Sequence, residues 1–398
     1  MHLLNPQIQA QLGNSSAIRK MFETGIELRK KVGADKVCDF SLGNPDVPPP
    51  PAVRTALLDA AETVSRPFSL GYPPNAGLPS LRAALAKKLS KEQDTPLEAA
   101  HVLVTCGAAG AITSFFRAVL EPGDEILVPS PYFVEYGAYC GHFGGVLKAV
   151  PSKLPDFAPD VDAFAEAMTP RTRAILLNNP NNPTGCLYST GQIAAIGALL
   201  EKANSDGRDR PVFLLSDEPY RFLVYDGMTV PPALPVSPYA VVFGSFSKTL
   251  SLAGERIGYI AVNPAMPGVA DLLAACTMTI RTLGFVNAPV IGQKIAEYAL
   301  DSGVSVDLYQ RRRDAMAKVL EDAGIEFAMP RGAFYFFPKA PGGDEKRFVE
   351  LLQQEYILAV PGSGFGLPGH FRLSFAVDEE KILQSAEGFQ RAAAAARA

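Results

Sequence analysis

Short apolar runs, each followed at once by a polar or glycine-rich segment, recur along the chain as far as residue 262. The runs at 102–104, 126–128, 174–177, 213–216 and 241–243 predict buried strands, with helical or loop segments between them. Strands that alternate with helices predict an α/β fold, in which helices cover a mostly parallel sheet. Because parallel strands end at one edge of a sheet, the polar segments that follow them are expected to line one crevice.

The pattern changes after residue 262. Residues 270–279 predict a helix, and residues 289–321 predict one long helical region. Within that region, the charged cluster 311–314 is expected to form a solvated helix face. The apolar runs 333–337 and 371–375 predict strands of a second, smaller sheet.

The segment around Lys248 carries the most distinctive chemistry. Lys248 follows a predicted buried strand after a short serine-rich turn, and Arg256 precedes the next apolar run, 257–262. Desolvation lowers the pKa of an ammonium group and makes the amine a nucleophile towards an aldehyde. A guanidinium is suited to grip a phosphate. Together they suggest a lysine that holds a phosphate-bearing aldehyde cofactor as a Schiff base. For Lys248 taken alone, a surface lysine in a loop is the better explanation, so the rest of the chain decides.

Other segments offer groups for the same crevice, and each has a plainer structural explanation. Small residues at 105–111 would let a phosphate approach a helix N-terminus, or would serve tight packing. Tyr132 would stack on a flat ring or be half-buried, and Tyr72 lies in a loop that either binds a ligand or only connects. Asp217 would face a cationic ring nitrogen, cap a helix or form a salt bridge. Arg372, inside an apolar run, needs a carboxylate from the protein or from a ligand.

Composition narrows the class of protein. The chain has 398 residues and a net charge of −4, without a basic block, which argues against nucleic acid as a partner. No apolar run is long enough for a membrane span, and the first residues do not resemble a secretory signal. Five scattered cysteines without a CxxC pair favour the cytoplasm. The four histidines lack metal-ligand spacing, so no metal is expected and a cofactor should carry any difficult chemistry.

With these residues together, the chain resembles a class I/II pyridoxal-phosphate aminotransferase of the aspartate aminotransferase fold, fold type I. The motifs that carry the resemblance occur in the family's order over nearly the whole length: 39–46, 182–185, Asp217 with Tyr220, 245–248 with Arg256, and 371–375. The resemblance implies an N-terminal arm that is part of a small domain at 1–48. It further implies a large domain with a mostly parallel seven-stranded sheet flanked by helices at 49–288, and a smaller α+β domain at 289–398.

The resemblance also implies roles at the cofactor ring. Lys248 would bond pyridoxal 5′-phosphate as a Schiff base and then move the substrate proton. Asp217 would keep the ring nitrogen protonated, while Tyr220 and Asn182 would donate hydrogen bonds to the phenolic oxygen. The chain has no tryptophan, so Tyr132 would be the ring that stacks on the cofactor.

Further implied roles concern the anionic groups of cofactor and substrate. Arg372 would clamp the substrate α-carboxylate, with Gly43 and Asn182 beside it. A homodimer is implied, in which Tyr72 reaches the phosphate held by the neighbouring subunit. Within one subunit, the implied phosphate ligands are Ala108, Ala109, Ser245, Ser247 and Arg256.

The implied activity is transfer of an amino group between an L-amino acid and a 2-oxo acid by a ping-pong aldimine/ketimine mechanism. The alternative is a pyridoxal-phosphate-dependent carbon–sulfur lyase that acts by β-elimination on the same fold. A non-catalytic regulator on this fold would need an added DNA-binding unit, for which 398 residues leave no room. Neither Arg281 nor Arg19 is a secure match for an arginine that reads a dicarboxylate side chain, so the amino donor stays open.

Overall fold

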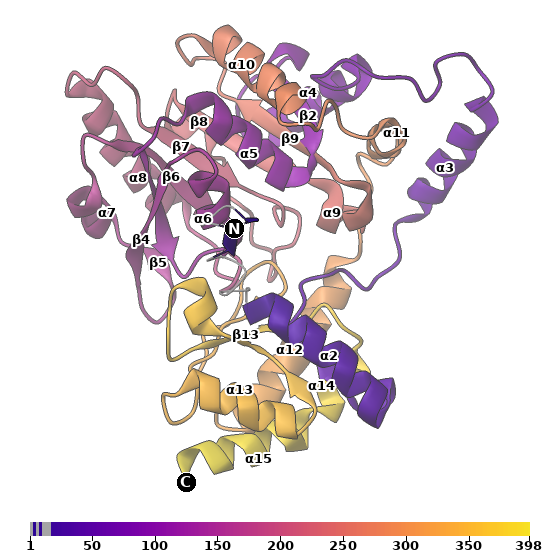
Figure 1. Cartoon of the computed structure of the whole chain (residues 1–398), viewed down its shortest axis with the longest axis vertical. Coiled ribbons are helices and arrows are strands. Elements are labelled where there is room, and N and C mark those ends of the chain that lie inside the picture. The colour runs from indigo at the N-terminus through magenta and orange to yellow at the C-terminus, as the bar shows by residue number, and fades with distance from the viewer. Residues whose placement is uncertain (1–2, 5–7, 10–16) are drawn as a thin grey trace.

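The computed structural model describes residues 3–4, 8–9 and 17–398. Figure 1 shows a larger domain of sheet and helices above a smaller domain, with the chain's last helix at the lower end. The chain passes from the smaller domain to the larger one through α3 (Pro51–Thr63), which lies at the edge of the molecule. The α/β fold expected from the sequence is therefore confirmed.

The larger domain is built on one sheet with the strand order β2-β9-β8-β7-β6-β3-β4-β5. Neighbouring strands run parallel except at β9, which is antiparallel to β2 and β8, and at β5, which is antiparallel to β4. Because β5 has only two residues, the other seven strands form the expected mostly parallel sheet. In chain order the strands are β2 (Val102–Cys106), β3 (Glu125–Ser130), β4 (Val146–Lys153), β5 (Ala158–Pro159), β6 (Thr172–Asn178), β7 (Phe213–Asp217), β8 (Ala240–Ser245) and β9 (Ile257–Val262).

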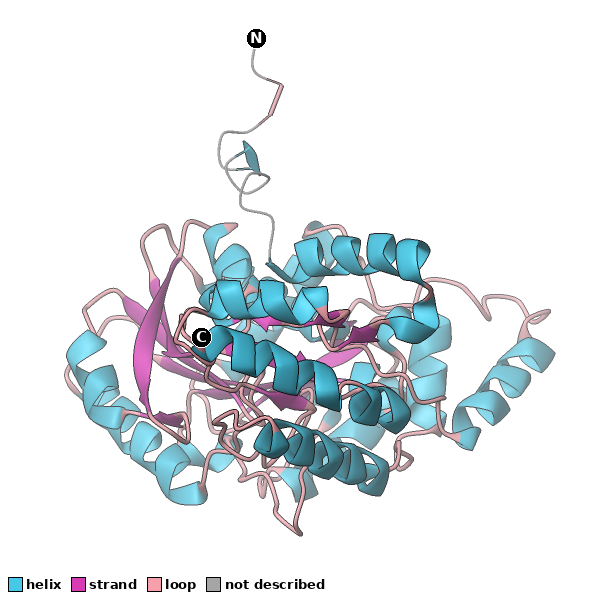
Figure 2. Cartoon of the chain, turned by 90° about the horizontal axis from the view of Figure 1, so that it is seen from below, coloured by secondary structure: helices cyan, strands magenta, loops and turns pink. Residues whose placement is uncertain are grey.

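Helices cover both faces of this sheet, as Figure 2 shows. Side chains alternate between the faces along each strand, so the adjacent residues Val241 and Val242 belong to different apolar cores. The core around Val241 contains residues of α5 (Gly107–Val119), α6 (Glu135–Gly141) and α10 (Val269–Thr282). The core around Val242 contains residues of α3, α4 (Pro79–Glu92), α7 (Val161–Ala167), α8 (Thr190–Ser205) and α11 (Val290–Tyr298).

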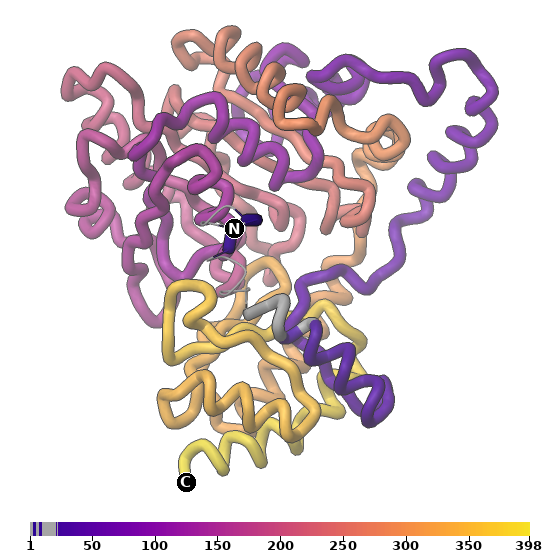
Figure 3. The backbone as a smooth tube through the Cα atoms, viewed as in Figure 1, coloured from indigo at the N-terminus to yellow at the C-terminus, as the bar shows by residue number. Residues whose placement is uncertain are grey.

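The smaller domain is built from segments near both ends of the described chain. Its three-stranded sheet has the order β10 (Tyr335–Phe336), β13 (Phe371–Ser374), β12 (Val360–Pro361), so the two apolar runs predicted as strands are confirmed. Close to the N-terminus, β1 (Cys38–Asp39) pairs in parallel with β11 (Ile357–Leu358). Figure 3 shows the indigo N-terminal helix beside the orange and yellow segments from the other end. The helices of this domain are α2 (Ala17–Val32), α12 (Val306–Asp322), α13 (Glu345–Gln354), α14 (Glu379–Gln384) and α15 (Ala386–Arg397).

The long helical region expected at 289–321 is two helices, so that expectation is wrong. Helix α11 ends at Tyr298 and α12 begins at Val306, after a segment whose Val304 amide donates to Thr249 O at 2.9 Å. Ser305 caps α12, since its side chain accepts a hydrogen bond from the Leu308 amide. The expected boundary at 289 assigns α11 to the smaller domain, whereas α11 packs against α3 and α4.

The charged cluster at 311–314 is solvated only in part, which corrects the second expectation for this region. Arg311 and Asp314 are exposed, whereas Arg312 and Arg313 are buried. Arg312 and Arg313 are 6% and 4% exposed. Arg312 donates to both carboxylate oxygens of Asp46 at 2.7 and 2.8 Å, and Arg313 to both of Asp226 at 2.7 and 3.0 Å. The acids come from segments far away in the sequence, so the helical pattern alone gave no sign of these pairs.

We expect Asp46→Asn to lower the free energy of unfolding by about 2 kcal/mol, because it leaves the buried Arg312 guanidinium without its carboxylate. The loss is smaller than for a fully buried pair because Asp46 itself is partly exposed. Urea unfolding followed by circular dichroism measures the difference. Glu350→Gln removes an exposed charge on α13 and should change stability by less than about 0.5 kcal/mol. Equal stabilities of the two variants would contradict the structural role of this pair.

Candidate active site

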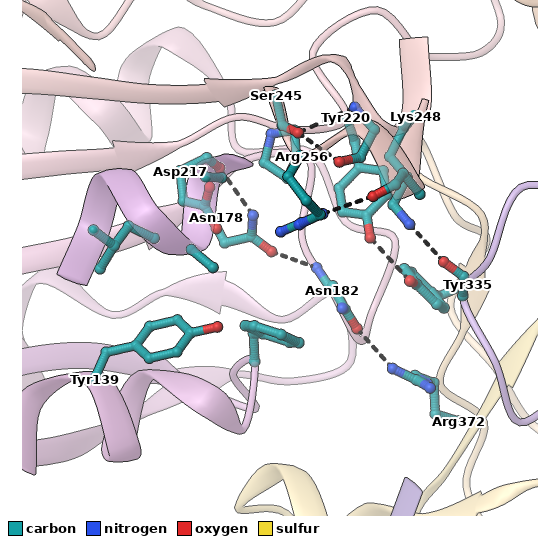
Figure 4. A pocket seen from close by; sticks show the side chains of 18 residues that line it. Tyr139, Asn178, Asn182, Asp217, Tyr220, Ser245, Lys248, Arg256, Tyr335 and Arg372 are labelled. Atoms are coloured by element: carbon teal, nitrogen blue, oxygen red, sulfur yellow. Dashed lines mark hydrogen bonds between the residues drawn. The ribbon is translucent and has the colours of Figure 1, made fainter. Parts of the chain in front are cut away.

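A cavity of about 320 Å³ lies where strand ends of the larger domain meet residues of the smaller one (Figure 4). The strands β6, β7 and β8 each direct side chains to its wall, as the parallel arrangement predicts. The sequence-predicted residues that line it are Gly43, Ala108, Ala109, Asn182, Asp217, Tyr220, Ser245, Ser247, Lys248, Arg256 and Arg372. Residues from distant parts of the sequence are therefore brought to one place.

Lys248 lies on the four-residue helix α9 (Phe246–Thr249), directly after β8. Its Nζ donates a hydrogen bond to Gly43 O at 2.6 Å, and it lies 5.5 Å from the centre of the Phe334 ring. Burial lowers the pKa of the Lys248 ammonium from 10.5 to about 8, with smaller contributions from the charges of Arg256 and Arg372. A substantial share of this amine is therefore neutral near physiological pH, as a nucleophile requires.

Asp217 ends strand β7 and is almost completely buried. Tyr136 on α6 donates a hydrogen bond to its Oδ2 at 2.5 Å, whereas Oδ1 has no hydrogen-bond partner among the described residues. Burial raises the pKa of the Asp217 carboxyl from 3.8 to about 7; the Tyr136 hydrogen bond lowers it, and the charge of Glu218 adds to the rise. A buried carboxylate oxygen without a partner is suited to a cationic or N–H donor on a ligand.

Asparagine side chains fix the wall between Asp217 and the smaller domain. Asn178, the last residue of β6, donates from Nδ2 to Asp217 O at 2.9 Å and accepts from the Asn182 amide at 2.6 Å. The Asn182 side chain in turn accepts from Arg372 Nη1 at 3.1 Å. Asn178 and Asn182 thus connect the backbone carbonyl of Asp217 to the guanidinium of Arg372.

At the other end of the cavity, the elements of an anion site converge. Arg256 has a left-handed backbone conformation and donates to Ala253 O at 2.9 Å, but no carboxylate of the described chain forms an ion pair with it. Gly107 has a backbone φ of +70°, which favours glycine, and a Cβ there would lie 2.6 Å from Arg256 Nη2, so Arg256 passes close to this backbone. Ala108 and Ala109 lie in the first turn of α5, and the Ser245 and Ser247 hydroxyl oxygens are 2.8 Å apart. A helix N-terminus, two hydroxyls and a free guanidinium suit a phosphate.

Arg372 is a second cation of the cavity without an acid among the described residues and, unlike Arg256, it is buried. Its guanidinium lies between the rings of Tyr335 and Phe365, at 4.8 and 4.7 Å from their centres. Besides Asn182, it donates to Ser41 O at 2.6 Å, and its Nε has no partner among the described residues. A buried guanidinium that is paired only with neutral groups is prepared for a carboxylate or another anion.

Two of the expected site residues lie outside this cavity. Tyr132 does not line it: a Cβ on Gly366 would lie 2.8 Å from Tyr132 Cε1, and the Tyr132 amide donates to Phe365 O at 3.1 Å. The next residue, Phe133, lines the cavity instead, because adjacent side chains point in different directions. Tyr72 is 91% exposed on the segment between α3 and α4.

Of the two candidates for reading a dicarboxylate, Arg281 is exposed on α10 and does not line the cavity. The Arg19 side chain lies outside the part of the chain whose side chains are described. Sequence reasoning also missed residues that do line the cavity, namely Ile112, Phe133, Tyr139, Asn178, Pro219, Ala253 and Tyr335. Tyr335 in particular lies in an apolar run, where nothing marks its hydroxyl as different from a core residue.

Comparisons with known proteins agree with this geometry. Residues 35–389 match the family described as aminotransferase class I and II. A probable aspartate/prephenate aminotransferase of Aquifex aeolicus is 34% identical, over 92% of this chain and 93% of the relative. The aspartate/prephenate aminotransferase of Thermus thermophilus is 33% identical, over 98% of this chain and 99% of the relative.

Solved structures give the same result. An amino transferase from Eubacterium rectale has a TM-score of 0.94 at 36% identity and covers both chains completely. Aspartate aminotransferase from Thermus thermophilus with maleate has a TM-score of 0.87 at 30% identity, covering 98% of this chain and all of the other. This chain belongs to the class I and II aminotransferase family and is a transaminase. Nothing in the comparisons favours the lyase alternative. Among the described residues, no helix is long and apolar enough to span a membrane.

The pKa of Asp217 predicts how stability depends on pH in the cofactor-free protein. The carboxyl binds its proton more tightly when folded, so its contribution to the free energy of unfolding is fully present below about pH 4 and is lost as the pH rises towards about 7. The shift corresponds to on the order of 4 kcal/mol. Asp217→Asn should remove this loss, so the variant gains stability relative to the wild type over that range.

Urea unfolding at stepped pH measures this difference. The matched control Asp209→Asn changes an exposed acid and should leave the pH profile of the wild type unchanged. Parallel profiles for Asp217→Asn and the wild type would show that the burial of Asp217 does not raise its pKa.

Proposed function

We propose that this transaminase uses pyridoxal 5′-phosphate, held by the cavity around Lys248, to move an amino group between an L-amino acid and a 2-oxo acid. The observation that carries the proposal is that Lys248, Asp217 and Arg256 line one cavity. Such a cofactor needs a largely buried amine of lowered pKa, a carboxylate oxygen free to accept and a guanidinium free to bind an anion. Within the described part of the chain, Asp217 Oδ1 has no hydrogen-bond partner and Arg256 has no acidic partner.

The donor set fits the parts of the cofactor one by one. The amine of Lys248 would bond the aldehyde, and Asp217 Oδ1 would accept from the ring nitrogen. Tyr220 and Asn182 would face the phenolic oxygen, and Phe133 takes the stacking role first assigned to Tyr132. The phosphate would be held by the first-turn amides of α5 at Ala108 and Ala109, together with Ser245, Ser247 and Arg256. When bound, the cofactor supplies an exchangeable carbonyl and a ring that takes up the negative charge left on the substrate carbon.

The chain's own groups then bind, orient and move protons. Arg372 would bind the α-carboxylate with two parallel hydrogen bonds, and Asn182 and Gly43 would bound the same space. Lys248 Nζ, when it is no longer bonded to the cofactor, would accept the proton from the substrate α-carbon and deliver it to the former aldehyde carbon of the cofactor. Its contact with Gly43 O keeps the amine close to the carboxylate site, which favours this transfer by proximity.

The names of the relatives make aspartate and prephenate the first substrates to test. A screen of amino donors against 2-oxo acid acceptors on the purified protein tests the reaction class. A transaminase forms the new amino acid and the new 2-oxo acid in equal amounts. Release of ammonia without a new amino acid would instead support the lyase.

Lys248→Ala is expected to lower kcat by about 10⁴-fold or more, because it removes both the covalent anchor and the proton carrier. The visible absorbance of bound cofactor should change, while the circular dichroism stays that of the wild type. Lys91→Ala, which removes an exposed lysine of α4, is the matched control and should keep full activity. Activity of Lys248→Ala at the wild-type level would refute the proposed mechanism.

We propose a homodimer in which Tyr72 reaches the phosphate bound by the partner. Apolar side chains on and after α3 are exposed, as in an uncovered interface. They are Leu57, Leu58, Val64, Phe68 and Leu70, with Phe68 93% exposed. We also propose a cytoplasmic location, which the five free cysteines support.

Phe68→Asp should shift the protein towards monomer in light scattering, because it places a charge in the proposed interface. Leu383→Asp introduces the same charge at an exposed leucine of α14 and should leave the dimer intact. Tyr72→Phe should weaken phosphate-cofactor affinity about tenfold without changing the oligomeric state. Dimers of Phe68→Asp that match the wild type would exclude this interface.

A further inference from the structure

Tyr335 contacts three residues of the site at once: Tyr220, Arg372 and Gly43. Its hydroxyl oxygen lies 2.9 Å from that of Tyr220, and the Arg372 guanidinium carbon lies 4.8 Å from its ring centre. A Cβ on Gly43 would lie 1.9 Å from the Tyr335 hydroxyl oxygen, so the two residues are in direct contact. Figure 4 shows Tyr335 between Lys248 and Arg372, at the side of the cavity formed by the smaller domain.

The hydrogen bond between the two tyrosines has a direction that matters. Each hydroxyl has one proton, so one tyrosine donates it and the other accepts. If Tyr220 donated to Tyr335, no Tyr220 proton would be left for a ligand in the cavity. If Tyr335 donates, the Tyr220 proton is free to point into the cavity.

The charge of Arg372 favours the second arrangement. The guanidinium lies against the face of the Tyr335 ring, and a nearby cation makes a phenol a better hydrogen-bond donor. The position of Tyr335 is also fixed by the sheet. It lies on β10 and pairs with Ser374 of β13, which is two residues after Arg372 on the same strand. Both tyrosines are buried, at 4% exposure for Tyr220 and 2% for Tyr335, so each hydroxyl has few alternatives to the other as a partner.

We infer that Tyr335 is a positioning residue for transamination, with separate tasks for its hydroxyl and its ring. The hydroxyl donates to Tyr220 and so directs the Tyr220 proton towards the phenolic oxygen of the cofactor. The ring supports the Arg372 guanidinium that binds the substrate carboxylate. This inference rests on the proposed function, because it uses the cofactor and carboxylate sites named there.

Two substitutions separate the tasks. Tyr335→Phe keeps the ring against Arg372 and removes only the hydroxyl. In the cofactor-loaded enzyme it should raise the pH midpoint of the cofactor's absorbance change by about half a unit to one unit, since Tyr220 then donates less well to the phenolic oxygen. It should lower kcat about threefold to tenfold and leave the KM for the amino donor within about twofold of the wild type.

Tyr335→Leu removes the ring as well and should also raise the KM about tenfold, since Arg372 loses one of its two supporting rings. Tyr309→Phe is the matched control, because its buried hydroxyl has no partner among the described residues and its ring belongs to the same aromatic cluster. It should leave the midpoint, kcat and KM at wild-type values.

The outcomes are distinguishable. If wild-type protein supplied with pyridoxal phosphate shows neither a cofactor band nor turnover, the proposed function fails, and this inference with it. If the wild type is active but Tyr335→Phe keeps its absorbance midpoint, the assignment of Tyr335 is overturned while the proposed function stands. A raised KM in Tyr335→Phe with an unchanged midpoint would overturn it as well, because the hydroxyl would then act only in substrate binding.

Discussion

The structure depends on burying charges that the chain does not neutralise by itself. Lys248 and Arg372 lie in one cavity without a carboxylate partner among the described residues, and Asp217 lies in the same cavity with one oxygen unpaired. Arg256 also lines this cavity, although it is exposed. Desolvation of this kind costs free energy, which a folded protein recovers only if other regions are very well packed. The two cores on either side of the sheet are such regions. The ligands complete the charge balance, so binding and the stability of the fold are directly linked.

The fold makes this arrangement possible through simple geometry. Parallel strands deliver Asn178, Asp217 and Ser245 to one edge, and a short helix after the last of these strands adds Lys248. The smaller domain then closes the edge with Arg372 and Tyr335. Each domain contributes a charged group, and neither domain alone makes a complete site.

Most of this architecture could be predicted from the sequence, and the exceptions have physical causes. The apolar runs predicted the central strands because strands buried on both faces leave a continuous signal. Charged residues beside or within an apolar run are rare, and this marked Lys248, Asp217, Arg256 and Arg372 as candidates. Tyr132 was assigned the stacking role because it is an aromatic residue just after a predicted strand in a chain without tryptophan, but the direction of a side chain after a strand is not visible in sequence. Arg312 and Arg313 were placed in solvent because their acids come from distant segments, and only the folded structure brings them together.

The pairing of β1 with β11 has a consequence for synthesis. One piece of the smaller domain is made before the larger domain, and the rest is made only after it. The emerging chain can therefore complete its larger domain on the ribosome before the segments that pack against α2 and β1 have been synthesised. A messenger cut short before residue 357 would yield a polypeptide in which β1 has no partner strand, so this segment would be open to cellular proteases.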